Sequence, residues 1–263
     1  SALTTPAPCV QRLPAPPAAT AEAEGTVATF TQYRENAVAF NLDFTQRTIG
    51  KLFFTAPGGD ATCSGAVVSG NNLVVTAAHC CYTPGSGFHT NFTFFPGYRL
   101  GASPFGGFTA RTAVVPAGWR TGGFNRRKND VCLLRMRPNR DGRDITFFTG
   151  HLGLGMGLPY VQSLHAVGYP GNIGGTEFME LCTAESFRPP RGCGRDNVLN
   201  MGCSMTFGSS GGPWVAGYRG SNLVTGVVSG YDDATCTGPF GTTFNGPRFT
   251  AATIGKLCDR LGG

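Results

Sequence analysis

Turn-forming residues interrupt this sequence at short intervals, since its 263 residues include 40 glycines and 18 prolines. Charged residues make up only 14% of the chain, which is few for a protein with long exposed helices. This composition favours many short strands joined by tight turns. Because 41% of the residues are hydrophobic, the chain can form a sizeable core, as one large all-β domain or as two smaller ones.

Strand-like segments follow one another along the chain. They are residues 49–54, 62–68, 73–76, 92–95, 108–115, 131–136, 163–169, 176–181 and 223–229. Residues 250–261 carry the helical pattern, because their apolar side chains recur at steps of three and four. The first 25 residues are rich in Pro, Ala and Thr and predict an extended arm that is tied down at Cys9. A polar and basic stretch at 137–150 divides the strands into two groups.

The ten cysteines, spread from Cys9 to Cys258, predict disulfides formed in an oxidising compartment. Free thiols with a metal site are the alternative, but no Cys-x-x-Cys pair occurs. No apolar run approaches the ~20 residues that span a bilayer. The chain begins at Ser1 and reads as a processed product, so we expect a secreted protein that is not embedded in a membrane.

The formal net charge of +6 raises the possibility of a nucleic-acid partner. The basic residues are scattered, however, apart from residues 126–128 and the run 135–143. Neither stretch is interleaved with the aromatic residues that stack on bases. We therefore interpret them as a solvated basic face and expect no nucleic-acid binding.

Three short segments contain the residue types of nucleophilic catalysis: TAAHC at 76–80, NDVCLL at 129–134 and GSSGGP at 208–213. A serine between glycines can occupy a tight turn that exposes its hydroxyl. The backbone N–H groups of Gly208 and Ser210 would then bind the oxyanion that forms when a carbonyl is attacked. A plain surface turn is the alternative interpretation of the third segment taken alone.

The serine needs a base, and histidine titrates near neutral pH. His79 is the candidate because it follows an apolar strand, whereas we expect His89, His151 and His165 to be surface or satisfied core residues. Asp130 begins an apolar strand, where an unpaired carboxylate would be costly. It is therefore expected to pair with His79, orient the imidazole and stabilise its charged form.

The three segments, in this order, resemble the chymotrypsin-like serine peptidases. The segments IGKLFF, TFFPGY, GYPG and CSMTFGSSGGPWV are most similar to the secreted glutamyl-endopeptidase-like branch of that family. The resemblance covers about residues 48–260. It implies an all-β fold of two six-stranded antiparallel barrels with a C-terminal helix, and a catalytic triad in the cleft between the barrels.

On this basis we expect an arm at 1–47, a first barrel at 48–140 with His79 and Asp130, and a second barrel at 141–263 with Ser210. The resemblance implies a disulfide between Cys63 and Cys80 beside the histidine. Cys182 and Cys203 are the next expected pair, and the other six cysteines are left unpaired. The resemblance also implies that the substrate is bound by Ser204, Met205, Val228, Ser229, Gly230 and Tyr231.

Two departures from the family pattern affect activation and specificity. Trypsin-like members have Asp before the nucleophile, where this chain has Ser209, so a trypsin-type activation is not expected. Val228 stands where the glutamyl branch has a carboxylate-binding histidine, and Met205 stands where that branch often has a hydroxyl. We therefore expect cleavage after small or medium apolar residues. Cleavage after basic residues is the rival, through Asp232 or Asp233.

The leading interpretation is an endopeptidase that forms an acyl-enzyme, with protein or peptide substrates and no metal or organic cofactor. A catalytically silent binding module of the same fold is one alternative. An esterase that uses the same chemistry is another. We expect a monomer.

Overall fold

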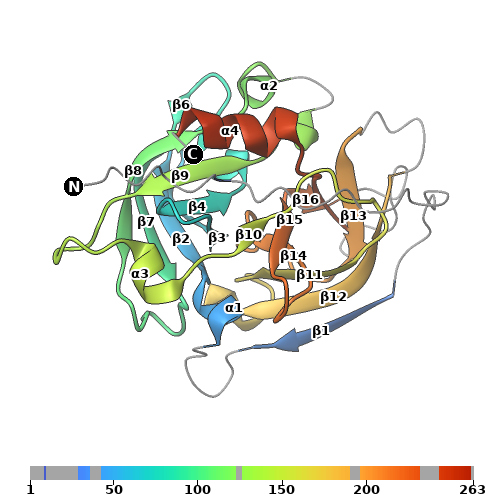
Figure 1. Ribbon diagram of the computed structural model, residues 1–263, viewed down its shortest axis with the longest axis horizontal. Coiled ribbons are helices and arrows are strands. Elements are labelled where there is room, and N and C mark those ends of the chain that lie inside the picture. Colours follow the sequence, from blue (N-terminus) through green and yellow to red (C-terminus); the bar gives the residue numbers. More distant parts are fainter. Residues whose placement is uncertain are drawn as a thin grey trace, which may run out of the picture.

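Two β-sheets carry most of the regular structure of the chain (Figure 1). The computed structural model describes Cys9 and residues 29–35, 43–122, 126–189, 196–231 and 243–261. Cys193 and Cys236 lie outside these residues. Within the described chain, none of the helices has both the length and the apolar character needed to cross a membrane.

The first sheet closes on itself as an antiparallel barrel with the strand order β2-β3-β4-β9-β8-β7. Its strands are β2 (Ile49–Ala56), β3 (Gly59–Val68), β4 (Leu73–Thr76), β7 (Thr90–Pro96), β8 (Phe108–Val114) and β9 (Cys132–Met136). Leu52, Phe94 and Leu133 are fully buried in its core. The sequence therefore predicted this barrel correctly, because its strands are the apolar runs of the first half.

The second sheet has nine strands, with the order β10-β15-β14-β11-β12-β13-β17-β16 and β1 added to β12. Its strands are β1 (Phe30–Arg34), β10 (Gly153–Leu154), β11 (Ser163–Gly168), β12 (Glu180–Phe187), β13 (Val198–Gly202), β14 (Pro213–Ala216), β15 (Leu223–Val227), β16 (Gly230–Tyr231) and β17 (Thr243–Pro247). This sheet is larger than the six strands expected. The extra strands come from β1, from β16 and from β10, which pairs with β15 in parallel.

Two glycines let β15 and β17 of the second sheet lie against each other. A Cβ atom at Gly226 would lie 2.7 Å from the Pro247 carbonyl oxygen, and one at Gly246 would lie 2.1 Å from the Val227 carbonyl oxygen. The N–H of Phe249 also donates to the Thr225 carbonyl at 2.9 Å. The sheet therefore curls round towards a second barrel, with Trp214 and Phe244 fully buried in its own core.

Short elements connect the strands: α1 (Phe44–Arg47), η1 (Ala78–Cys80), β5 (Tyr82–Thr83), β6 (Gly87–Phe88), α2 (Ala117–Arg120), η2 (Arg126–Asn129), α3 (Ile145–Thr149) and η3 (Gly174–Thr176). The chain ends in the π turn η4 (Ala251–Gly255) and the helix α4 (Lys256–Arg260), within the segment where the sequence predicted a helix. The strand expected at 176–181 begins only at Glu180. Residues 174–176 instead form a turn in which Gly174, Gly175 and Thr176 have positive φ.

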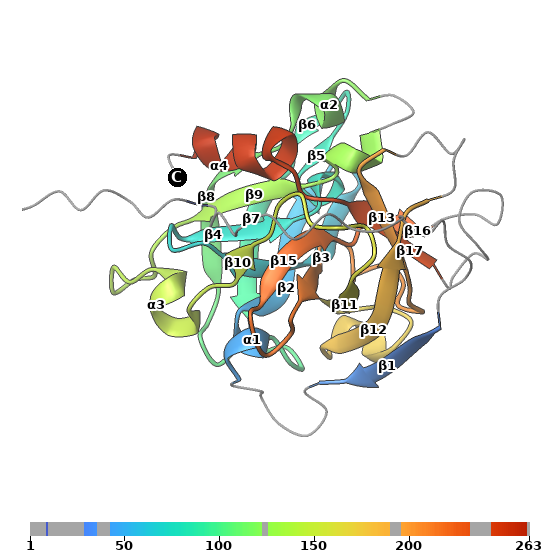
Figure 2. The ribbon, with the colours of Figure 1, turned by 45° about the vertical axis from the view of Figure 1, so that its right-hand side comes forward.

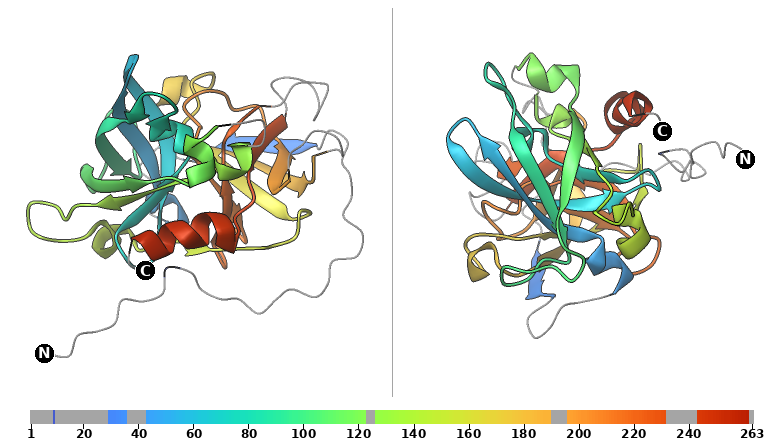
Figure 3. Two further views of the ribbon diagram at one scale, coloured as in Figure 1. Left: turned by 90° about the horizontal axis from the view of Figure 1, so that it is seen from above. Right: turned by 90° about the vertical axis from the view of Figure 1, so that its left-hand side faces the viewer.

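The described part of the N-terminal arm is attached to the rest of the molecule at two places, the second sheet and the C-terminal helix α4. Strand β1 pairs with β12 at the outer edge of the second sheet (Figure 2). Cys9 forms a disulfide with Cys258 of α4, which packs beside the first barrel (Figure 3). Neither contact was foreseen beyond the expectation that Cys9 ties the arm down.

We predict that Gly246→Ala destabilises the fold by about 1–3 kcal/mol, because the new methyl group would overlap backbone that has little room to move. Gly58→Ala is the matched control, since nothing lies within 4 Å of a Cβ at that position. Denaturant unfolding with the disulfides intact measures both variants. Equal stability of the two would show that β15 and β17 are not in close contact.

Candidate active site

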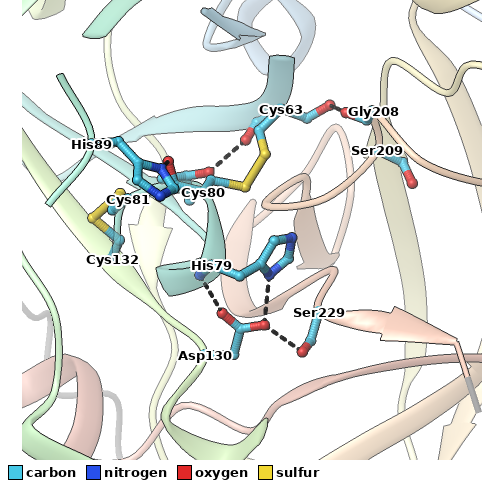
Figure 4. Close-up of a disulfide and its surroundings, with 12 residues drawn as sticks. Cys63, His79, Cys80, Cys81, His89, Asp130, Cys132, Gly208, Ser209 and Ser229 are labelled. Atoms are coloured by element: carbon cyan, nitrogen blue, oxygen red, sulfur yellow. Dashed lines mark hydrogen bonds and ion pairs between the residues drawn. A yellow bond between two sulfur atoms is a disulfide. The ribbon is translucent and has the colours of Figure 1, made fainter. Parts of the chain in front are cut away.

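His79 and Asp130 meet at the side of the first barrel, where η1 follows β4 and the chain enters β9. The Nδ1 atom of His79 lies 2.8 Å from Oδ2 of Asp130, and the His79 backbone N–H donates to Oδ1 at 2.9 Å (Figure 4). The hydroxyl of Ser229 also donates to Oδ2, at 2.5 Å. Ser229, which is expected to bind substrate, thus also supports Asp130 through its hydroxyl.

Two disulfides hold this histidine and this aspartate in place. Cys80 bonds to Cys63 on β3, and the adjacent Cys81 bonds to Cys132 at the start of β9. The structure thus contains the expected pair Cys63–Cys80. It also contains the Cys182–Cys203 pair that was the next expectation. The Cys81–Cys132 bond was left open by the sequence, although it joins the residues two positions beyond His79 and Asp130.

Burial and charge act in opposite directions on the two groups. Burial disfavours the imidazolium, but the charge and hydrogen bond of Asp130 outweigh it, so the pKa of His79 is raised above its ordinary value of 6.5. Burial would raise the pKa of Asp130, yet the charge of His79 and the hydrogen bonds from His79 and Ser229 hold that pKa below 3.8. Asp130 is therefore ionised at neutral pH while being only 1% exposed.

The loop that carries Ser210 docks onto the first barrel through Ser64 of β3. The Ser64 N–H donates to the Ser210 carbonyl at 2.7 Å, and the Ser64 hydroxyl donates to the Gly208 carbonyl at 2.9 Å. Gly211 has φ +77, and a Cβ there would lie 2.0 Å from Oγ1 of Thr76, three residues before His79. The loop consequently lies against the segment that leads into η1.

The structure thus brings the segments of His79, Asp130 and Ser210 together from both halves of the chain. Within the described residues, no hydrogen bond joins the Ser210 hydroxyl to His79. Catalytic hydrogen bonds are often long before substrate binds. Gly208 has φ +90, a conformation that glycine adopts readily. The N–H groups of Gly208 and Ser210 have no acceptor among the residues that the structure describes.

The other residues expected to bind substrate lie at different depths. Met205 and Val228 are buried in the core cluster of the second sheet, which also contains Phe244. Ser204 is half-buried, and its hydroxyl donates to the side chain of Gln32. Gly230 and Tyr231 form β16, which pairs with β17. Asp232 and Asp233 lie outside the described residues.

A cation that the sequence analysis placed on a solvated face lies beside this strand. Arg127 reaches from η2 to the side chain of Asn245 on β17. A Cβ at Gly230 would lie 3.2 Å from Nη1 of Arg127. Arg127 therefore brings positive charge to β16. The one sequence feature that hinted at a place near the site is its position three residues before Asp130.

His89 has a structural role beside η1. The ring of His89 is buried, stacks on Phe54 and lies 2.9 Å from the Cys80 carbonyl through Nδ1, which supports η1 from the side opposite Asp130. Burial lowers its pKa.

Cys63, His79 and Cys80 have possible metal-ligand atoms within 4.8 Å of one another. Their two sulfur atoms are bonded to each other, so they offer no thiolate.

Two further residues of the site were missed in the sequence. Ser64 was not singled out, because a serine inside an apolar strand gives no catalytic signal. Phe207, directly before Gly208, is 71% exposed, the highest exposure among the large hydrophobic side chains described. A Cβ at Gly171 would lie 2.1 Å from the Phe207 ring, so this ring covers Gly171 at the surface.

Comparisons with known proteins agree with this geometry. The sequence matches the family described as trypsin-like peptidase domain over residues 63–234. A search of curated protein sequences gives no match. The structure is similar to the protease Anisep from Arthrobacter nicotinovorans, with 28% sequence identity and a TM-score of 0.75, over 88% of this chain and 99% of Anisep.

Two other solved structures are also similar. The thermostable serine protease AL20 from an extremophilic microorganism has 26% identity and a TM-score of 0.73, over 83% of this chain and 98% of AL20. A Glu endopeptidase has 17% identity and a TM-score of 0.67, over 91% of this chain and 99% of its own. At that identity the likeness is one of fold.

We predict that Asp130→Asn lowers the pKa of His79, because it removes the carboxylate that raises this pKa and leaves the burial that lowers it. Histidine titration followed by NMR measures the shift. Asp259→Asn, which changes an exposed aspartate of α4, should leave the His79 titration unchanged. An unshifted His79 in Asp130→Asn would contradict the pairing as the source of the raised pKa.

Proposed function

This chain belongs to the trypsin-like peptidase family, and from that premise we propose that it is a secreted serine endopeptidase. The observation that carries the proposal is the His79–Asp130 pair, with Asp130 accepting three hydrogen bonds while almost fully buried. An ionised, oriented carboxylate behind a histidine is what a serine hydroxyl needs to become a nucleophile. The four disulfides among the described residues support folding in an oxidising compartment.

In the proposed reaction, the Ser210 hydroxyl attacks the carbonyl carbon of the peptide bond while His79 takes its proton. The negative charge on the former carbonyl oxygen is stabilised by the N–H groups of Gly208 and Ser210. His79 then gives the proton to the leaving amine, and an acyl-enzyme remains. His79 then takes a proton from water, which attacks the ester carbon; the bond to the Ser210 oxygen breaks, His79 returns the proton to that oxygen, and the carboxylic acid product leaves. Asp130 holds the imidazole in one tautomer and stabilises its charged form throughout.

Activation does not follow the trypsin route in this proposal. Ser209 stands where a trypsin-type chain has a carboxylate, and its hydroxyl donates to the Thr206 carbonyl at 2.5 Å. Ser209 is 1% exposed, so it is satisfied locally by a neutral hydrogen bond. A newly formed N-terminal amine would find no charge partner in this residue. Adding or removing a few residues before Thr48, away from Cys9 and strand β1, should therefore leave activity largely unchanged.

The substrate side chain before the cut is proposed to be small or medium and apolar. Met205, Val228 and Phe244 fill one buried cluster behind the nucleophile loop, which leaves less room for a long side chain. An acidic side chain among these apolar groups would lose its hydration. The likeness to a Glu endopeptidase does not oppose this, because it is a likeness of fold. Asp232 and Asp233 remain the basis of the rival preference for basic residues.

We predict that Ser210→Ala lowers peptidase activity by about 10⁴-fold or more, because it removes the nucleophile while leaving the backbone of the loop in place. Cleavage of a mixed peptide library measures the activity, and labelling by a fluorophosphonate probe measures the reactive serine. Ser221→Ala, at an exposed serine, is the matched control.

Three outcomes would overturn this assignment. Activity of Ser210→Ala within tenfold of the unchanged protein would remove Ser210 from the reaction. A folded, unchanged protein that neither cleaves peptides nor reacts with the probe would instead be a silent binding module. Cleavage of esters but not of amides would make the protein an esterase.

The same peptide library tests the proposed specificity. We expect most cuts after small or medium apolar residues. Dominant cutting after Glu would refute this preference. Dominant cutting after Arg or Lys would refute it as well and would favour Asp232 or Asp233 as the residue that binds the basic side chain of the substrate.

A further inference from the structure

We propose that Lys51 is a positioning residue. Its hydrogen bonds to Thr176 of η3 and to Glu177 hold this turn in place, and the turn supports the loop at Gly208 that is proposed to bind the oxyanion. Lys51 lies on β2 of the first barrel, whereas Gly208 belongs to the second half of the chain. The inference rests on the proposed function, since an oxyanion forms only if the protein transfers acyl groups. It concerns a residue that none of the active-site segments contains.

Lys51 is a buried cation with a defined set of partners. Its side chain is only 3% exposed, and its ammonium donates to Oε1 of Glu177 at 3.0 Å and to Oγ1 of Thr176 at 2.8 Å. The ammonium also lies 4.5 Å from the ring centre of Tyr98. The Tyr98 hydroxyl donates to Glu177 as well, at 2.9 Å from Oε2. Both hydrogen-bonding partners of Lys51 therefore come from the turn η3 and the residue after it.

This turn lies directly against the oxyanion-binding glycine. A Cβ at Gly208 would lie 2.8 Å from the Thr176 methyl group and 2.5 Å from the Tyr169 carbonyl oxygen. Thr176 itself has φ +66, which is uncommon and costly for a β-branched residue. Its backbone N–H donates to the Pro170 carbonyl at 3.0 Å, and its hydroxyl accepts the hydrogen bond from Lys51. These bonds hold Thr176 in a conformation that it would otherwise leave.

The segment before this turn is also joined to the nucleophile loop. The Gly171 N–H donates to the Phe207 carbonyl at 2.7 Å. Asn172 and Thr206 exchange hydrogen bonds in both directions, since the Thr206 N–H donates to Oδ1 of Asn172 at 3.0 Å and the Asn172 N–H donates to the Thr206 hydroxyl at 3.2 Å. Movement of residues 170–177 would therefore move residues 204–208.

Electrostatics make Lys51 suited to this role. An ammonium that is almost fully buried is stable only with its partners in place, because an unpaired buried charge is strongly unfavourable. The carboxylate of Glu177 and the hydroxyl of Thr176 are thus held at a fixed point of the first barrel. Ser209 within the loop makes only a local neutral hydrogen bond. The charged anchor of the loop accordingly comes from outside it, through Lys51 and Glu177.

The test compares Lys51→Met with Lys256→Met, which removes a lysine from the exposed face of α4. The kinetic constants are measured per active site, counted by fluorophosphonate labelling, and amide hydrogen exchange is measured for residues 204–211. In Lys51→Met we expect kcat to fall by about 10–100-fold with KM nearly unchanged, because a misplaced oxyanion donor costs up to ~10²–10³-fold. We expect exchange in 204–211 to accelerate, while the barrel strands keep their protection. Lys256→Met should match the unchanged protein in both.

Thr176→Val provides the same test if Lys51→Met does not fold, since it removes only the hydroxyl that accepts from Lys51. Its kcat should fall and its exchange at 204–211 should rise, in the same direction. Unchanged exchange in the folded variant would overturn the inference, and so would faster exchange with an unchanged kcat. If the unchanged protein cleaves nothing, the proposed function fails, and the exchange measurement still tests whether Lys51 braces the loop.

Discussion

Ser64 joins the two halves of this molecule at the point where chemistry is proposed. Every polar group of this residue forms a hydrogen bond. Its N–H donates to the Ser210 carbonyl, and its hydroxyl donates to the Gly208 carbonyl. Its hydroxyl also accepts from the Tyr169 N–H, and its carbonyl accepts from the Thr76 hydroxyl. Ser64 is fully buried, so each of these bonds is made away from competing water. Its neighbour Cys63 is bonded to Cys80, beside His79. A short path of covalent and hydrogen bonds thus fixes the distance between the candidate nucleophile and its base.

Asp130 and Lys51 are buried charged groups near the active-site segments, and each has its own set of partners. Asp130 is stabilised by His79 and Ser229, so its pKa stays low despite burial. Lys51 is stabilised by Glu177 and Thr176 on the opposite side of the loop. Burial would raise the pKa of Glu177, but hydrogen bonds and the opposite charge of Lys51 hold that pKa below its ordinary value, so Glu177 is ionised at neutral pH. The loop of residues 208–212 lies between the His79–Asp130 pair and the Lys51–Glu177 pair. It consists of glycine and serine, so it adds no further buried charge.

The sequence predicted the parts of this structure that local pattern determines. The strands of the first barrel were found because each is a short apolar run between turn residues. The family segments pointed to His79, Asp130 and Ser210, of which the structure joins His79 and Asp130 by a hydrogen bond. Pairings between distant residues were not predictable in this way. Cys81 and Cys132 are joined only because η1 and β9 are neighbours in the folded barrel. The strands β13 and β17 were missed, since Val198–Gly202 and Thr243–Pro247 contain polar and turn-forming residues that are buried by their partners. Ser64 and Lys51 act through tertiary contacts alone.

The bond between Cys9 and Cys258 makes the chain a covalent ring across a sequence separation of 249 residues. A single hydrolysed peptide bond anywhere inside that ring opens it but releases no fragment. A peptidase that cuts one of its own exposed loops once would therefore hold both pieces together, and on a gel without reductant the two pieces would run as one band. Only reduction would separate the pieces. Strand β1, which lies inside the ring and is paired with β12, would likewise stay attached after a cut on either side of it.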